Sequence, residues 1–161
     1  MSKKVEQSVA LSTDSVSGVL VGRFDHALDP KKRLTVPSDW RALMGNADAV
    51  YAMPDPVKKC VNLIPKAEME SRLEKLRERS LFDQDCADAL EIIGINSELL
   101  PFDVQGRVRI CDRFLSFANL SGTVAMVGAV RMIRLWNPSV LGPATRVEQS
   151  SLAGALKRVA F

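Results

Sequence analysis

The chain has 161 residues, of which 47% are hydrophobic and 25% are charged, and its formal net charge is +3. This composition is typical of a globular protein with one sizeable core or two small fused cores, and it excludes disorder throughout the chain. The mild positive charge permits a nucleic-acid partner without requiring one, so the case for such a partner depends on local clusters of Lys and Arg.

The N-terminal segment, residues 1–18, contains Ser, Lys and Glu but no long apolar run. We therefore expect a flexible arm here and not a signal peptide. No segment approaches transmembrane length, which favours a cytoplasmic protein without a membrane partner. The three cysteines stand singly, without C-x-x-C spacing, as expected for small buried side chains in a reducing compartment; a catalytic thiol is the disfavoured alternative. These cysteines are Cys60, Cys86 and Cys111.

The first folded unit, residues 19–65, is predicted to have the order β-loop-β-α-β-β. Alternating apolar residues predict the strands, and a turn with Pro and Lys separates the first two. Pro37 ends the second strand, Ser38 is expected to cap a helix, and Gly45 is expected to end it. The predicted elements are strands over residues 19–25, 33–36, 49–53 and 60–64 and a helix over residues 38–44.

The middle segment, residues 66–96, is predicted to be a helical connector. Apolar residues recur at helical spacing over residues 66–80, with Glu, Lys and Arg on the exposed faces. A second helix is predicted over residues 84–93, and Gly94 is expected to end it. The apolar residues of these two helices are Met69, Leu73 and Leu76, and Ala89, Leu90 and Ile93.

The second folded unit, residues 97–140, is predicted to repeat the order of the first. Pro138 is expected to follow the end of its last strand. The tail, residues 141–161, carries apolar residues at helical spacing and is predicted to form a short helix, either packed or frayed. The predicted elements of the second unit are strands over residues 98–102, 107–111, 123–127 and 131–136 and a helix over residues 113–118.

An internal repeat relates the two folded units. The motif Asp-x-x-x-Arg at Asp29 and Arg33 recurs 74 residues later at Asp103 and Arg107. The motif alone could arise by chance, but the residues around it match at the same displacement, which predicts a pseudo-symmetric pair of units. The matches are Leu34 and Val36 with Val108 and Ile110, Trp40 with Phe114, Leu43 with Phe117, the N-cap candidates Ser38 and Asp112, and Gly45 with Asn119.

Three aromatic side chains need a choice between structure and function. Trp40 and Phe114 are predicted to anchor the short helices to the core, with stacking on nucleic-acid bases as the disfavoured alternative. His26 is the only histidine, so neither a His-Cys zinc cluster nor a Ser-His-Asp triad repeated in both halves is available. We interpret His26 as a polar residue of a strand.

The run from Gly22 to Pro37 resembles the signature of the MraZ transcriptional regulators, a bacterial family. The second unit resembles the second half of that family at residues 103–110, at Val127-Gly128 and at Leu135-Trp136. The resemblance covers about residues 19–140 and implies an α+β fold with two pseudo-symmetric, AbrB-like swapped-hairpin β-barrel halves joined by helices. It also implies a ring-shaped homo-oligomer that binds short direct repeats of double-stranded DNA upstream of the division and cell-wall gene cluster. Such a protein would be associated with the nucleoid and would need no cofactor, metal or small-molecule substrate.

The resemblance places four residues in the DNA-contacting loops: Asp29, Arg33, Asp103 and Arg107. An arginine on a hairpin loop can bind N7 and O6 of guanine with two hydrogen bonds in the major groove. A nearby aspartate can orient the guanidinium or accept a hydrogen bond from N4 of cytosine. Further basic residues, Lys31, Lys32 and Arg109, are placed to meet phosphates and make binding sensitive to salt.

Simpler interpretations remain open. An Asp-Arg pair four residues apart can merely brace a turn, and a Lys-Lys-Arg run is often only solvated. An enzyme is disfavoured because the sequence has no phosphate-binding glycine loop, nucleophile elbow or cofactor fingerprint. The stronger rival is an antitoxin-like interaction protein of the same fold that does not read operator DNA; exposed loops among positive charges would favour the regulator.

Two positions depart from the family pattern. Lys32 stands where the second loop has Gly106, and a positive φ at Lys32 would be strained, so we expect the first loop to differ in shape and the two halves to differ in DNA affinity. Cys111 stands where a proline would match Pro37.

Overall fold

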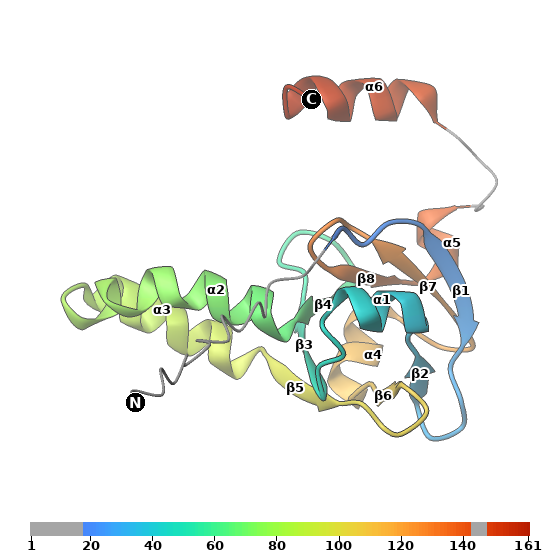
Figure 1. The fold of residues 1–161 in the computed structure, drawn as a ribbon, viewed down its shortest axis with the longest axis horizontal. Helices are drawn as coiled ribbons and strands as arrows, with labels where there is room; N and C mark the ends of the chain where they lie inside the picture. The colour runs from blue at the N-terminus through green and yellow to red at the C-terminus, as the bar shows by residue number, and fades with distance from the viewer. Residues whose placement is uncertain (1–17, 143–147) are drawn as a thin grey trace, which may run out of the picture.

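A computed structural model describes residues 18–142 and 148–161 of the chain. The described residues form a mixed α/β fold in which every strand pairing is antiparallel, which confirms the general class expected from the sequence (Figure 1). The elements in chain order are β1 (Arg23–Ala27), β2 (Arg33–Thr35), α1 (Ser38–Leu43), β3 (Ala49–Pro54), β4 (Val61–Pro65), α2 (Lys66–Arg77), a 3₁₀ turn η1 (Arg79–Leu81), α3 (Gln84–Ile95), β5 (Glu98–Pro101), β6 (Arg107–Arg109), α4 (Asp112–Ala118), β7 (Thr123–Gly128), β8 (Ile133–Trp136), α5 (Pro138–Leu141) and α6 (Gln149–Arg158).

Six strands form one sheet in the order β1-β7-β8-β4-β3-β5, and β2 pairs with β6 as a separate two-stranded ribbon. The counterparts in the two units are β1 and β5, β3 and β7, and β4 and β8. Exchanging each strand for its counterpart gives the same order read from the opposite edge of the sheet. Three of its five pairings join strands of different units, namely β1 with β7, β8 with β4 and β3 with β5, and the other two, β7 with β8 and β4 with β3, lie within one unit. Hydrogen bonds therefore run between the units, and within the described residues they close no barrel, so the expected barrel halves are not found.

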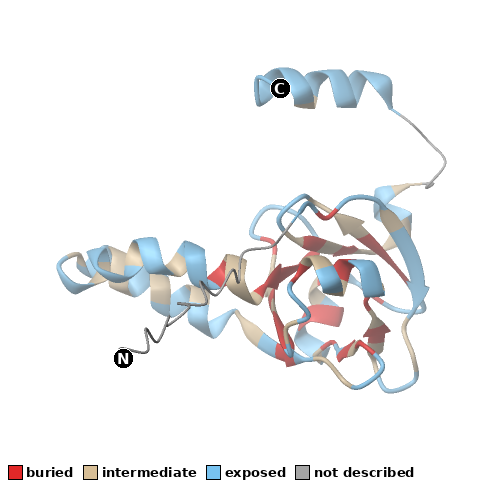
Figure 2. Ribbon diagram, viewed as in Figure 1, coloured by how far each residue is buried: buried red, intermediate tan, exposed pale blue. Residues whose placement is uncertain are grey.

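The core lies between the sheet, the ribbon and helices α1 and α4 (Figure 2). Leu34 of β2 and Val108 of β6 are fully buried, while their neighbours along each strand are not, as alternation in a strand requires. Trp40 and Phe114 are only 3% and 1% exposed, which confirms them as core anchors. Their burial leaves no ring face for a nucleic-acid base.

Several predicted boundaries were wrong by one to four residues, and three of them have a clear description. The first strand begins at Arg23 and not at residue 19, because Gly22 has a φ of 96° and interrupts the extended chain. Helix α3 continues past Gly94 to Ile95, since a glycine inside a helix costs only about 1 kcal/mol relative to alanine and does not by itself end the helix. The last strand of the second unit begins at Ile133 and not at residue 131.

The predicted N-caps of α1 and α4 were wrong, whereas the residues predicted to follow these helices were right. Ser38 and Asp112 are the first helical residues of α1 and α4, and neither helix start has a side-chain cap. Asp112 instead pairs with a lysine of the first loop, described below. Gly45 and Asn119 do have the left-handed backbone expected after a helix, with φ of 76° and 51°.

The connector helices α2 and α3 form a hairpin that projects from the sheet (Figure 1). The predicted helix in the tail is confirmed as α6, which is exposed and not packed against a core. The predicted N-terminal arm lies outside the described residues except for Gly18. His26 is an exposed residue of β1, as predicted. Among the helices in the described ranges, none has the length and apolar character needed to cross a lipid bilayer.

Candidate nucleic-acid interface

Loop 1 (residues 29–33) and loop 2 (residues 103–107) have the same backbone hydrogen bonds. Each loop closes with two internal bonds, and each is tied to the other loop's strand by a third. The matched bonds are Asp29 N to Arg33 O (3.0 Å) with Asp103 N to Arg107 O (2.9 Å), Lys32 N to Asp29 O (2.9 Å) with Gly106 N to Asp103 O (3.0 Å), and Val36 N to Gly106 O (3.1 Å) with Ile110 N to Lys32 O (2.9 Å).

This match contradicts the expectation that loop 1 differs in shape. Lys32 adopts a φ of 62°, close to the 75° of its counterpart Gly106. A left-handed backbone costs a non-glycine residue roughly 1–2 kcal/mol, and the hydrogen bonds within loop 1 hold Lys32 there. Cys111 also replaces the expected proline without a change in backbone, since its φ and ψ of −70° and 154° resemble the −52° and 138° of Pro37.

Each loop aspartate holds the arginine four residues later. One oxygen of Asp29 accepts the backbone N–H groups of Lys31 (2.9 Å) and Arg33 (2.8 Å), and the other accepts Nε of Arg33 at 2.6 Å. In loop 2, Asp103 binds the backbone N–H groups of residues 105 and 107 at 2.9 Å each, and Nε of Arg107 at 2.7 Å. The turn-bracing interpretation is therefore correct in geometry, and the same brace also fixes each guanidinium.

The braces lower the pKa of both aspartates. Partial desolvation raises the pKa of Asp29, but the hydrogen bonds from the Arg33 backbone and side chain outweigh it and hold the pKa below the ordinary value of 3.8. For Asp103 the backbone N–H of Arg107 is the largest cause, opposed by desolvation and reinforced by the Arg107 side chain. Both carboxylates are therefore ionised at neutral pH.

The ribbon of β2 and β6 presents the arginines on one face. Arg33 lies opposite Arg109, and Arg107 lies opposite Thr35. These four residues alternate with buried Leu34 and Val108, so they share the face that points away from the core. Within the described residues, neither Arg33 nor Arg107 donates a hydrogen bond from an Nη atom, which leaves both Nη groups of each arginine available to a ligand.

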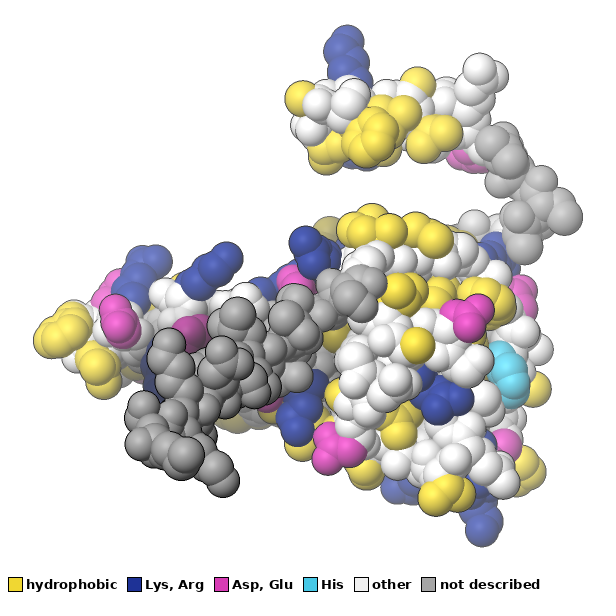
Figure 3. Space-filling view, in the orientation of Figure 1, with side chains coloured by type: hydrophobic (Ala, Val, Ile, Leu, Met, Phe, Trp, Pro, Cys, Tyr) yellow, Lys and Arg dark blue, Asp and Glu magenta, His cyan; other side chains and the backbone are white. Residues whose placement is uncertain are grey.

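The lysines of loop 1 are placed differently from each other. Lys31 is exposed and has no ion-pair partner among the described residues, whereas Nζ of Lys32 binds the carboxylate of Asp112 at the start of α4. This contact lowers the pKa of Asp112. Figure 3 shows Lys and Arg side chains at the end of the body where the loops lie. The structure thus places all seven predicted residues on the ribbon of β2 and β6 and its two loops, with loop 1 and Arg109 at one end of the ribbon and loop 2 at the other.

One residue of this region was missed at the sequence level. Arg41 of α1 donates from Nε to the carbonyl oxygen of Val36 at 3.2 Å, and its guanidinium lies against the backbone of Gly106. The repeat gives no signal for it, because the residue 74 positions later is Leu115. Gly106 itself was a usable signal, because a residue without a side chain leaves space beside loop 2 for a group from another element.

The described residues offer little for other chemistry. They contain no group of three His, Cys, Asp or Glu side chains placed to hold a metal ion. Cys60 is fully buried, and burial together with nearby Asp55 raises the pKa of its thiol to about 11. Such a thiol is almost entirely protonated at neutral pH and is a poor nucleophile.

Acid should open both loops, and only below the ordinary aspartate range. A carboxylate with a lowered pKa stabilises the fold above its unfolded pKa, and that contribution is lost as pH falls through the lowered value. We expect the Nε–H NMR signals of Arg33 and Arg107 to shift in acid with transition midpoints below pH 3.8, the ordinary aspartate value. In an Asp29→Asn control the Arg33 signal should no longer titrate; transition midpoints at or above 3.8 in the wild type would contradict the assignment.

The chain is similar to curated transcriptional regulators over most of its length, although no family profile matches it. A transcriptional regulator MraZ of Rhodospirillum rubrum is 30% identical over 157 residues, covering 90% of this chain and 99% of the relative. One of Thermomicrobium roseum is 26% identical over 121 residues (74% of this chain, 82% of the relative). One of Mycoplasmoides gallisepticum is 29% identical over 119 residues (74% of this chain, 82% of the relative). These relatives agree with the resemblance seen in the loop motifs.

Proposed function

The chain belongs to the MraZ family of transcriptional regulators, and from this premise we propose that it binds short direct repeats of double-stranded DNA and regulates its own operon. The repeats would lie upstream of the division and cell-wall gene cluster, and the bound protein would be associated with the nucleoid. One observation carries the proposal: two identically braced arginines, Arg33 and Arg107, share one face of a two-stranded ribbon, and their Nη groups have no partner in the part of the chain that the structure describes.

The ribbon suits the major groove of B-DNA, which admits a two-stranded β-ribbon. Arg33 and Arg107 would each bind N7 and O6 of a guanine through their Nη groups. Asp29 and Asp103 would act as positioning residues, because their oxygens are already occupied by the loop and by Nε. This geometry disfavours the alternative in which the aspartates read cytosine. Lys31 and Arg109 are exposed and would meet phosphates.

We further propose that the two units are copies of one AbrB-like swapped-hairpin element. Three observations support this: the symmetric strand order of the sheet, the matched loop hydrogen bonds, and the pairing of β2 with β6 across the units. The halves would share one sheet instead of closing separate barrels.

A ring-shaped homo-oligomer would supply affinity that one ribbon lacks. One chain offers only two reading arginines, and simultaneous contact with several DNA repeats raises avidity without new contacts. Apolar side chains on the projecting hairpin support self-association, because Phe82, Ile92 and Ile95 are 92%, 62% and 64% exposed. Native mass spectrometry tests this part, and a monomer at working concentration would contradict it.

The proposal is tested by fluorescence anisotropy of labelled duplexes across a salt series. One duplex carries the region upstream of the protein's own gene, and a scrambled duplex of the same composition is the control. We expect tighter binding to the upstream duplex, which weakens as salt rises. Equal and feeble binding to both duplexes would favour the antitoxin-like interaction protein.

Removing the carboxylate of Asp112 should strengthen DNA binding. Asp112 now neutralises Lys32, so Asp112→Asn frees this lysine for a phosphate. We expect higher affinity for both duplexes and a salt dependence steeper by about 0.9 for each copy engaged, the value of one additional phosphate contact. Glu91→Gln on exposed α3 removes the same charge away from the loops and should change neither quantity. If both variants have the same DNA affinity and the same salt dependence, Lys32 does not contribute to DNA binding.

A further inference from the structure

Loop 2 lacks the lysines of loop 1. Lys31 and Lys32 correspond to Gln105 and Gly106, so Arg107 is the only cation within loop 2. The ribbon adds to this difference, because Arg109 lies opposite Arg33, at the loop 1 end, whereas Arg107 faces the neutral Thr35. On the ribbon and its loops alone, the loop 1 end would carry nearly all the positive charge.

A cation from another element occupies the space that Gly106 leaves. A Cβ atom on Gly106 would lie 2.3 Å from Cζ, 2.4 Å from Nε and 2.7 Å from Nη2 of Arg41, so the guanidinium lies directly against this glycine. Two hydrogen bonds connect Arg41 to loop 2 through one residue. Its Nε donates to the carbonyl oxygen of Val36 (3.2 Å), and the N–H of Val36 donates to the carbonyl oxygen of Gly106 (3.1 Å).

The charge of Arg41 is not neutralised. Across residues 18–142 and 148–161, no carboxylate lies within ion-pair distance of its guanidinium, and its Nη atoms donate no hydrogen bond. These Nη atoms are also absent from the buried polar atoms without partners, so water reaches them. At loop 1 the corresponding residue is Leu115, which is only 9% exposed, and therefore the arrangement exists at loop 2 alone.

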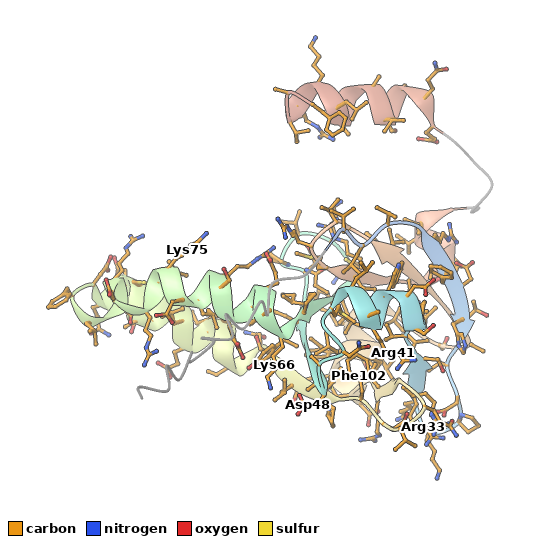
Figure 4. The ribbon with its side chains drawn as sticks, in the orientation of Figure 1. Arg33, Arg41, Asp48, Lys66, Lys75 and Phe102 are labelled. Atoms are coloured by element: carbon orange, nitrogen blue, oxygen red, sulfur yellow. The ribbon has the colours of Figure 1, made fainter. Side chains whose placement is uncertain are left out.

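We propose that Arg41 is the second DNA-binding arginine of the loop 2 end and contacts the phosphate backbone beside the base read by Arg107. The inference rests on the proposed function and deepens it. Each end of the ribbon then has one base-reading arginine and one partner: Arg33 with Arg109, and Arg107 with Arg41. Figure 4 shows Arg41 and Arg33 at the same end of the body, far from Lys75 on α2.

The test compares Arg41→Met, Arg41→Lys and wild type in the anisotropy assay across a salt series. Methionine fills space without charge, whereas lysine keeps the charge but not the planar group. We expect Arg41→Met to weaken binding to both duplexes and to lower the salt slope by about 0.9 for each copy engaged, and Arg41→Lys to restore most of that slope. Lys75→Met, which removes an exposed cation far from the loops, should leave both quantities unchanged.

A second measurement separates DNA contact from support of the loop. The Nε–H NMR signal of Arg107 reports whether the Asp103 brace survives each substitution. If that signal moves in both variants and the salt slope stays at the wild-type value, Arg41 only supports loop 2 and the inference is overturned. Unchanged DNA binding by Arg41→Met overturns it as well. Failure of the wild-type protein to bind either duplex would instead refute the proposed function on which it rests.

Discussion

Replacing Arg33 and Arg107 together by alanine is expected to weaken binding to the upstream duplex by about 30-fold or more. Each arginine that binds a guanine with two hydrogen bonds contributes roughly 1–3 kcal/mol of discrimination, so the loss of two such contacts removes about 2–6 kcal/mol. Binding to the scrambled duplex should fall much less, because it depends on phosphate contacts. The preference for the upstream duplex should therefore disappear.

The loops should keep their shape in this double variant. Asp29 and Asp103 retain the backbone N–H bonds that close each loop, and partly exposed ion pairs contribute only about 0–1 kcal/mol. Thermal melting should therefore stay close to the wild-type curve. The matched control is Arg72→Ala with Arg77→Ala, which removes the same charge from α2 and should leave the duplex preference intact.

Lysine at the same two positions separates the effect of the planar guanidinium group from the effect of its positive charge. Arg33→Lys with Arg107→Lys keeps both charges but loses the planar pair of donors that fits guanine. We expect specificity to fall while the salt slope stays near the wild-type value. Full preference for the upstream duplex in either double variant would show that these arginines do not read bases.

The periodicity of the sequence was enough to predict most elements of the fold, because apolar spacing depends on local structure. Alternation around Leu34 and Val108 and helical spacing around Met69 required no long-range information. The pairing of β1 with β7 and of β4 with β8 could not be predicted in this way, since it joins strands of different units. A repeat shows that two units are alike, but it does not show which unit supplies each partner strand.

The candidate site could likewise be predicted only in part from the sequence. Four of the seven predicted residues come from a motif and its copy, to which the family resemblance assigns DNA contact, and the other three are basic residues beside the motif. Arg41 was missed because it reaches loop 2 from a helix, where the copy has Leu115. The error about loop 1 arose because the backbone preference of Lys32 was considered without the hydrogen bonds that oppose it. The first failure concerns a contact from outside the motif, and the second concerns hydrogen bonds within it that the residue pattern alone does not reveal.

Phe114→Ala should be the most destabilising single substitution considered for this chain. The ring is 1% exposed and lies in the core beneath α4, and deletion of a buried phenylalanine side chain costs about 3–5 kcal/mol. Urea unfolding at a fixed protein concentration measures the effect, because assembly would make the midpoint depend on concentration. Phe161→Ala makes the same chemical change at a 97% exposed residue outside the projecting hairpin and should cost less than about 0.5 kcal/mol.

The milder Phe114→Leu keeps the prediction testable if the alanine variant does not fold. Leucine fills most of the space, and we expect a cost of about 1–2 kcal/mol. Its effect should also reach the DNA face, because α4 begins with Asp112, whose carboxylate holds Lys32 in loop 1. A loosened α4 would release this lysine, so Phe114→Leu should bind DNA with a steeper salt dependence than the wild type, although it is less stable. A destabilised variant with unchanged salt dependence would show that the pairing of Asp112 with Lys32 does not depend on how α4 is anchored.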